Sequence, residues 1–171
     1  MIKTYLKYTL YFIFIILLQG LVINNFQISV YLYPMVYVII ILMLPVEINI
    51  YFLLVAALVV GVSVDALSDT FGLHTSSCLT IAYVRPMVLN LVKPRDGYDN
   101  SLLLSIHDMG KVWFLSYAFI MIMIHHIWFF TFEMLRFNLM GMIIIKSILS
   151  SFISLVIIVL LQYLLFKPSK V

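Results

Sequence analysis

The apolar residues of this chain come in long unbroken blocks, without the spacing of one helical face or the alternation of a half-buried strand. The clearest block, Ile148 to Phe166, contains no charged side chain. An apolar stretch of about 18 or more residues can cross the hydrocarbon core of a bilayer as a helix. The composition agrees, with 65% hydrophobic residues, 10% charged residues and a mean hydropathy of +1.18. The sequence therefore predicts an all-α integral membrane protein.

The length of the chain limits how many times it can cross a membrane. Each crossing needs roughly 20 to 25 residues, so 171 residues have room for about six spans. We therefore expect a single polytopic transmembrane domain over residues 1–171 and no soluble catalytic domain. The expected spans are Tyr5 to Ile23, Ile28 to Leu44, Ile48 to Leu67, Phe71 to Val92, Val112 to Phe130 and Met142 to Phe166.

The basic residues predict the orientation of these spans. The net charge of +3 is small, and the basic groups lie beside apolar blocks, which fits orientation in a membrane rather than binding to nucleic acid. Basic residues near span ends are retained on the cytoplasmic side, so both termini are predicted to be cytoplasmic. One side of the six-span arrangement carries Lys3, Lys7, Lys93, Arg95, Lys111, Lys167 and Lys170.

The third expected span carries a stripe of small and acidic residues. Ala57, Gly61, Asp65 and Asp69 follow one another at a spacing of four residues, which places them on one helical face. Small residues allow close helix approach, and an acid within a span should face protein or a wet cavity. The stripe is therefore predicted to be a packing face, either internal or toward a partner. We expect Asp69 to cap the turn from Gly72 onward, whereas structural and functional roles stay open for Asp65.

Arg85 lies in the fourth expected span, where two interpretations are open. If that span runs to Val92, Arg85 is deep inside and needs an acid such as Asp65. If Pro86 ends the span, Arg85 lies at the cytoplasmic boundary and can extend its guanidinium to the surface. We favour the second interpretation.

The remaining polar residues do not form a catalytic pattern. His125 and His126 are adjacent, so on a helix their side chains diverge by about 100° and cannot hold one metal ion from the same face. The sequence contains no H-E-x-x-H motif and no phosphate-binding glycine loop. We therefore expect no enzymatic activity, no metal and no cofactor.

The longest charged segment, residues 93–99, connects the fourth and fifth expected spans. It includes Lys93, Arg95 and Tyr98, and the Asp96-Gly97 pair predicts a turn. Two roles are open for this cytoplasmic segment: a solvated loop, or a contact site for a cytoplasmic or membrane-bound partner.

The order of several short motifs resembles that of the MreD family of rod shape-determining proteins, particularly the version found in Bacteroidetes-type bacteria. The layout is similar over nearly the whole chain, and the diagnostic residues lie between Pro45 and Tyr98. They are Pro45, Gly61-x-x-x-Asp65, Phe71-Gly72-Leu73-His74, Tyr83-x-Arg85-Pro86 and Pro94-x-x-Gly97-Tyr98.

This resemblance implies a non-enzymatic scaffold in the bacterial inner membrane. Such a subunit would help to maintain cell shape by linking MreC and the cytoskeleton to lateral peptidoglycan synthesis. The implied partners are MreC, the actin-like MreB, the RodA glycosyltransferase, a class B penicillin-binding protein and membrane lipid, with a homodimer as an open alternative. The family also resembles in fold the substrate-binding subunits of energy-coupling-factor transporters. A vitamin-type transporter subunit, with a pocket around Asp65 and His74, is therefore the alternative function.

Overall fold

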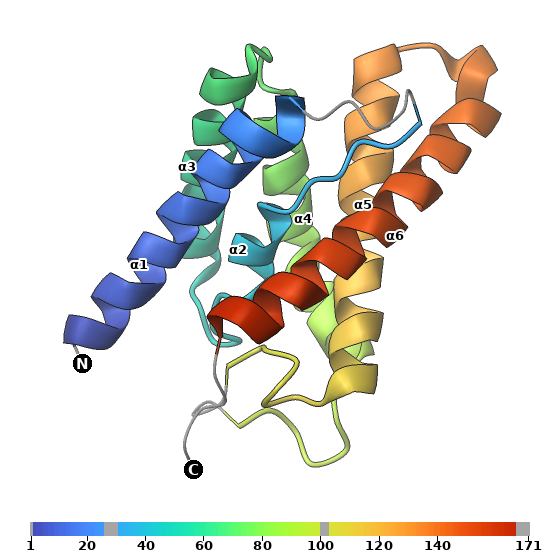
Figure 1. Ribbon diagram of the computed structural model, residues 1–171. Helices are drawn as coiled ribbons and strands as arrows, with labels where there is room; N and C mark the ends of the chain where they lie inside the picture. Colours follow the sequence, from blue (N-terminus) through green and yellow to red (C-terminus); the bar gives the residue numbers. More distant parts are fainter. Residues whose placement is uncertain (1, 26–30, 100–102, 167–171) are drawn as a thin grey trace.

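The computed structural model describes residues 2–25, 31–99 and 103–166, and these residues are mainly helical (Figure 1). Three helices, α3, α5 and α6, are long and apolar enough to cross a membrane. This result agrees with the predicted class of all-α membrane protein. The elements are α1 (Ile2–Leu17), the π-helix η1 (Leu18–Val22), the 3-10 helix η2 (Ile23–Asn25), α2 (Val38–Leu42), α3 (Ile50–Ser68), α4 (Leu73–Leu91), α5 (Lys111–Met134), the 3-10 helix η3 (Phe137–Leu139) and α6 (Met140–Leu165).

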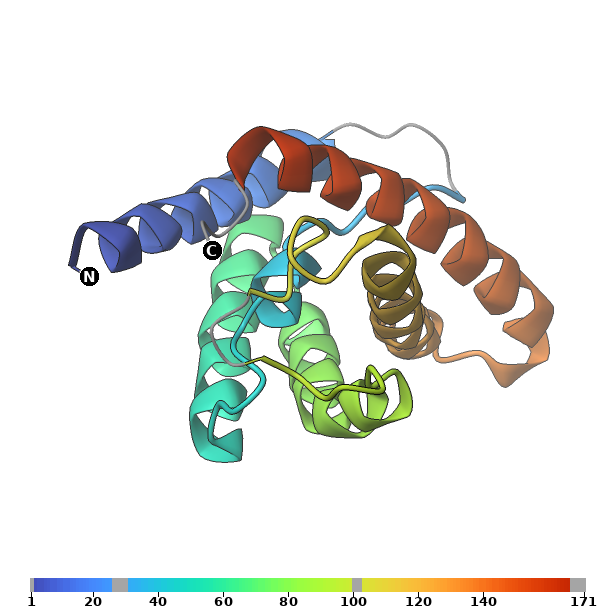
Figure 2. The same ribbon diagram turned by 90° about the horizontal axis from the view of Figure 1, so that it is seen from below.

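From α3 to α6, consecutive helices pack side by side and alternate in direction (Figure 1). The most extensive contacts join α3 to α4, α4 to α5, and α5 to α6. The start of α1 and the end of α6 lie at the same end of the bundle, together with the segment that connects α4 to α5 (Figure 1). Seen from below, α2 lies inside the bundle, where it contacts α3, α4 and α5 (Figure 2).

The second expected span, Ile28 to Leu44, is not a continuous helix, and that prediction is wrong. Residues 31–37 are not helical and lead to α2, which has only five residues. Pro34 explains part of the difference, because proline has no backbone N–H and disfavours a helical conformation in the residue before it. Met35 and all five residues of α2 are buried. The apolar composition of this segment therefore reflects burial rather than a spanning helix.

Irregular backbone in an apolar interior requires partners for its polar groups. Gln19, a fully buried residue of η1, supplies two of them. Its side chain accepts a hydrogen bond from the Val36 N–H at 2.7 Å and donates one to the Pro34 carbonyl at 3.1 Å. The amide of Gln19 thus binds the middle of the non-helical segment, residues 31–37.

Two serines of α6 bind the same segment from the other side. The Ser150 hydroxyl accepts a hydrogen bond from the Tyr33 N–H at 3.0 Å, and the Ser154 hydroxyl accepts one from the Met35 N–H at 2.9 Å. Both serines are fully buried. Side chains of η1 and α6 therefore position the non-helical segment between them.

Candidate functional site

Three of the four residues of the predicted stripe form an internal packing face of α3, whereas Asp69 lies past its end and is exposed. Ala57 is fully buried, and Gly61 and Asp65 are also buried. A Cβ atom at Gly61 would lie only 2.4 Å from the Cα of Thr75, so α3 and α4 approach as closely as a glycine permits. Of the two alternatives left open by the sequence, the structure favours internal packing over a partner-facing surface.

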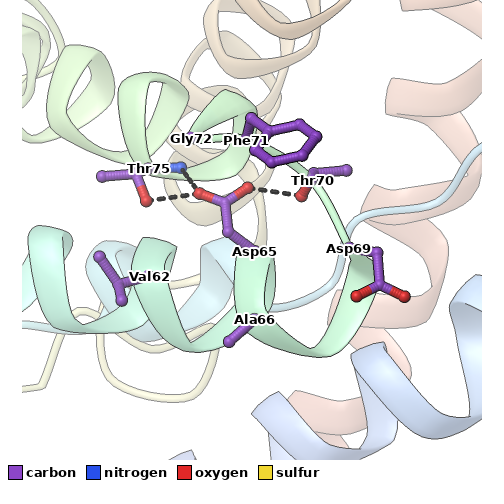
Figure 3. Close-up of a pocket in the computed structure, with 8 residues that line it drawn as sticks. All are labelled: Val62, Asp65, Ala66, Asp69, Thr70, Phe71, Gly72 and Thr75. Atoms are coloured by element: carbon purple, nitrogen blue, oxygen red, sulfur yellow. Dashed lines mark hydrogen bonds between the residues drawn. The ribbon is translucent and has the colours of Figure 1, made fainter.

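Asp65 is the polar centre of the contact between α3 and α4 (Figure 3). One carboxylate oxygen accepts hydrogen bonds from the Thr70 hydroxyl at 2.5 Å and from the His74 N–H at 3.1 Å. The other accepts them from the N–H and the hydroxyl of Thr75, at 2.9 and 2.5 Å. A carboxylate in this position satisfies free N–H groups at the start of α4 and opposes the positive end of its helix dipole. These four hydrogen bonds from three residues give Asp65 a structural role.

Asp69 does not have the capping role that the sequence predicted. It is the last residue of the α3 turn, with a left-handed backbone (φ 51°), and it is exposed. Its side chain points away from Asp65 and Thr70 (Figure 3). Asp65, one helical turn earlier, binds the start of α4 instead. The prediction was wrong because sequence distance from Gly72 is a poor guide once the chain reverses direction.

A pocket of about 410 Å³ lies beside this turn. Its lining residues are Val62, Asp65, Ala66, Asp69, Thr70, Phe71, Gly72 and Thr75. Phe71 is fully exposed at its edge. His74 contributes a backbone N–H to Asp65, but its ring is fully buried and is not part of the lining. Of the two residues proposed for a ligand pocket, the structure therefore brings only Asp65 to this one.

Arg85 contradicts the favoured interpretation of the fourth span. Helix α4 continues beyond Pro86 to Leu91, and the Arg85 residue is only 1% exposed. Its guanidinium therefore does not extend to the surface. It also does not pair with Asp65, whose oxygens bind the start of α4 at the other end of the same helix.

The guanidinium instead binds main-chain carbonyls just after α2. It donates hydrogen bonds to the carbonyls of Leu44 and of Pro45, the latter at 3.3 Å, and its Nε donates to the Tyr117 hydroxyl at 2.9 Å. That hydroxyl in turn donates to the Leu42 carbonyl at 3.3 Å. A cation near a helix C-terminus is favourable because the last carbonyls have no partner within the helix. Arg85 and Tyr117 thus supply hydrogen-bond donors for carbonyls at the end of α2 and just after it.

The loop after α4 is folded against the helices. Lys93 and Arg95 are exposed, and the turn at Asp96-Gly97 is present, with φ 84° at the glycine. The Tyr98 hydroxyl donates to the Leu89 carbonyl at 2.7 Å, and partial burial raises the pKa of this hydroxyl. Tyr98 therefore anchors the loop, whereas the two basic residues remain available to solvent.

Lys93 and Tyr98 also line a second pocket, of about 310 Å³, together with Glu47. The Tyr98 ring meets Trp113 at a centroid distance of 5.9 Å, and the Trp113 indole donates to the Val92 carbonyl at 2.8 Å. The pocket thus brings together two of the candidate residues of this segment, Lys93 and Tyr98, whereas Arg95 does not line it.

A buried polar cluster of Tyr37, His74 and His125 was not predicted from the sequence. The Tyr37 hydroxyl lies 2.7 Å from Nδ1 of His74 and 2.8 Å from Nε2 of His125, and all three residues are fully buried. The available signal was the occurrence of ionisable side chains within apolar spans, which should face protein rather than lipid. Sequence alone did not show that these residues of α4 and α5 would meet at Tyr37.

The burial of the segment before α5 was also not predicted from the sequence. Leu104, Ser105 and Ile106 are buried, although they lie between the fourth and fifth expected spans. The fully buried Gln162 side chain of α6 accepts a long hydrogen bond from the Ile106 N–H at 3.4 Å. An amide thus binds a non-helical segment at this end too.

No protein-family model, curated protein or solved structure matches this chain. Within the residues that the structure describes, no group of three His, Cys, Asp or Glu residues is arranged to hold a metal ion. What the site geometry provides is a set of polar side chains that bind helix ends and irregular backbone within the same chain.

Proposed function

We propose that this protein is an MreD-type scaffold of the bacterial cell-elongation complex. In this role it links MreC and the cytoskeleton to lateral peptidoglycan synthesis and catalyses no reaction itself. The motifs between Pro45 and Tyr98 support the family assignment, and the helical fold with three membrane-compatible helices agrees with a membrane subunit. MreB, RodA and a class B penicillin-binding protein belong to the same proposed complex.

The proposal rests mainly on the contacts of the two buried charged residues, Asp65 and Arg85. Asp65 binds donors at the start of α4, and Arg85 binds the chain after α2, so each braces the protein's own backbone. Outward-facing positions of α3 are large and apolar, including Tyr51 and Phe52, which are 75% and 71% exposed. Such a surface suits contact with lipid or with a partner's membrane helix.

The proposed location is the bacterial inner membrane, with several crossings and both termini in the cytoplasm. Two observations support it. The start of α1 and the end of α6 lie at one end of the bundle (Figure 1). The loop that carries the exposed Lys93 and Arg95 lies at this end too, as the bias of basic residues toward the cytoplasm requires.

The test combines depletion with co-purification. We expect rod-shaped cells to become round when the chain is depleted, and we expect MreC to co-purify with the tagged chain in mild detergent. Cells that keep their shape, together with an eluate free of MreC, would contradict the proposal.

Two variants separate loss of the fold from loss of a partner. Gly61→Leu should reduce the amount of folded protein, because its side chain would collide with Thr75. Val59→Ala, at an outward position that is 58% exposed, should leave that amount unchanged. Loss of MreC with Val59→Ala alone would then indicate a partner contact on the outer face of α3.

The alternative, a vitamin-type transporter subunit, requires Asp65 and His74 to present polar atoms to one ligand. In the structure the Asp65 carboxylate binds Thr70 and Thr75 beside its pocket, whereas the His74 ring is buried outside that pocket with Nδ1 against the Tyr37 hydroxyl. High-affinity binding of a vitamin by the purified protein would favour this alternative over the scaffold.

A further inference from the structure

The cluster of Tyr37, His74 and His125 joins three elements at the centre of the bundle. Tyr37 directly precedes α2, His74 lies in the first turn of α4, and His125 lies in α5. Both imidazole rings meet the phenol ring edge-on, with centroid distances of 5.4 Å. Each ring directs one nitrogen to the phenol oxygen, and each has a second nitrogen on its outer side.

The protons of this cluster are limited. The Tyr37 hydroxyl has one proton, and a neutral imidazole carries one proton on either of its two nitrogens. If the hydroxyl donates to one ring, the other ring must donate to the phenol oxygen. Since His74 uses Nδ1 and His125 uses Nε2, this arrangement requires both rings to be protonated at Nε2 or both at Nδ1.

A second arrangement is available to a dry cluster. Both rings can donate to the phenol oxygen while the hydroxyl proton points to the Met35 sulfur, 3.9 Å away. A thioether is a weak acceptor, so this arrangement uses the hydroxyl proton poorly. It would place the proton of His74 on Nδ1 and that of His125 on Nε2, and would leave both outer nitrogens without a proton.

The outer nitrogens are the unusual feature. His74 Nε2 and His125 Nδ1 are buried and have no hydrogen-bond partner among the described residues. When the hydroxyl donates to one ring, one of these atoms is an N–H group and the other is a bare acceptor. A buried N–H group without a partner is costly, and such groups in proteins are commonly satisfied by bound water.

We propose that this cluster is a binding site for a buried water molecule. The water molecule accepts a hydrogen bond from the outer N–H of one imidazole. Its presence favours the arrangement in which the Tyr37 hydroxyl donates to one ring and accepts from the other. This site is separate from the pocket beside Asp65 and does not depend on the proposed scaffold function.

The test is ¹⁵N NMR of histidine-labelled wild-type protein in lipid nanodiscs, with water as the probe. We expect His74 and His125 to be protonated at the same nitrogen, either both at Nε2 or both at Nδ1. We also expect magnetisation transfer from water to the outer N–H, which is His74 Nε2 in the first case and His125 Nδ1 in the second. His126 is an internal reference, because its Nδ1 lies 2.8 Å from the Ile122 carbonyl and must carry a proton.

Two results would overturn the proposal. One is protonation of His74 at Nδ1 and of His125 at Nε2, which indicates the dry arrangement. The other is matched protonation without any transfer from water. Tyr37→Phe should shift the ring nitrogen signals of both histidines and leave those of His126 nearly unchanged. Tyr33→Phe is the matched control, because it removes a hydroxyl from the same segment but not from the cluster.

Discussion

The two ends of the helical bundle use side chains of opposite charge to bind opposite kinds of backbone group. At the upper end, the Asp65 carboxylate accepts hydrogen bonds from the first N–H groups of α4. At the lower end, the Arg85 guanidinium donates to carbonyls that follow α2. The carboxylate is matched to the free N–H groups at the start of a helix, whereas the guanidinium is matched to carbonyls of the non-helical chain just after α2. In this chain, buried charges bind the main chain rather than each other.

The two ends differ in burial. Asp65 is 7% exposed and lines a pocket, and two of its donors, Thr70 and Thr75, are only partly buried. Arg85 is 1% exposed and donates to the hydroxyl of Tyr117, which is fully buried. The two carbonyls that it also binds belong to Leu44, which is partly buried, and Pro45, which is exposed. The comparison therefore predicts a larger effect at the lower end.

The largest expected effect is that of Arg85→Leu. The substitution removes the donor of the Tyr117 hydroxyl, which is fully buried, and also the donor of the Leu44 and Pro45 carbonyls. We expect the free energy of unfolding to fall by about 3–5 kcal/mol, measured by denaturation in detergent micelles.

Arg85→Lys is the informative second variant, because it keeps the charge but loses the forked geometry of the guanidinium. It should recover part of the lost stability. Arg95→Leu, in the exposed loop, is the matched control and should leave the unfolding transition unchanged. Equal effects of Arg85→Leu and Arg95→Leu would mean that the guanidinium contacts do not support the fold.

Asp65→Asn should have the next largest effect. An amide retains only one acceptor oxygen, and its NH₂ group would face the donors of Thr70 or Thr75. We expect unfolding to become easier by about 2–3 kcal/mol. Asp69→Asn is the matched control, because asparagine suits the left-handed backbone at that position. A comparable loss with Asp69→Asn would contradict the assignment of the cap to Asp65.

Some of this arrangement could be predicted from sequence. Long apolar blocks without alternation indicate membrane helices whatever their neighbours are, so the ranges of α3 and α6 were close to the predicted spans. The spacing of Ala57, Gly61 and Asp65 also predicted a packing face, because the period of a helix is a local property. The sequence did not show which part of the protein, or which partner, packs against that face.

The rest depended on contacts between distant residues. The composition of the apolar run around Pro34 and Met35 does not distinguish a spanning helix from an irregular buried segment. The irregular form is stable because Gln19, Ser150 and Ser154 form hydrogen bonds with its backbone. Arg85 binds backbone carbonyls, and every residue has one. No pattern of side chains in the sequence could therefore predict which carbonyls it binds. Sequence reasoning looked for an acid because only side-chain charges are visible in a sequence.

The two buried glutamines give a smaller version of the same comparison. Gln19 makes hydrogen bonds of 2.7 and 3.1 Å to the segment before α2, whereas Gln162 makes a 3.4 Å bond to the Ile106 N–H and a contact with the Met43 sulfur. Gln19→Leu should therefore cost about 2 kcal/mol and Gln162→Leu about 1 kcal/mol of stability in the same unfolding assay. The reverse order would mean that the upper end is the more adaptable of the two.

The smallest expected effect is the coupling between Asp65 and Arg85. Because they lie at opposite ends of α4 and share no partner, the double variant Asp65→Asn with Arg85→Leu should lose the sum of the two separate losses, within about 0.5 kcal/mol. For the same reason, exchanging the charges by Asp65→Arg with Arg85→Asp should not restore folding, since each new charge would meet groups of its own sign at a helix end. Rescue by the exchanged pair would show that the two residues form an ion pair and that the separation of the two ends is wrong.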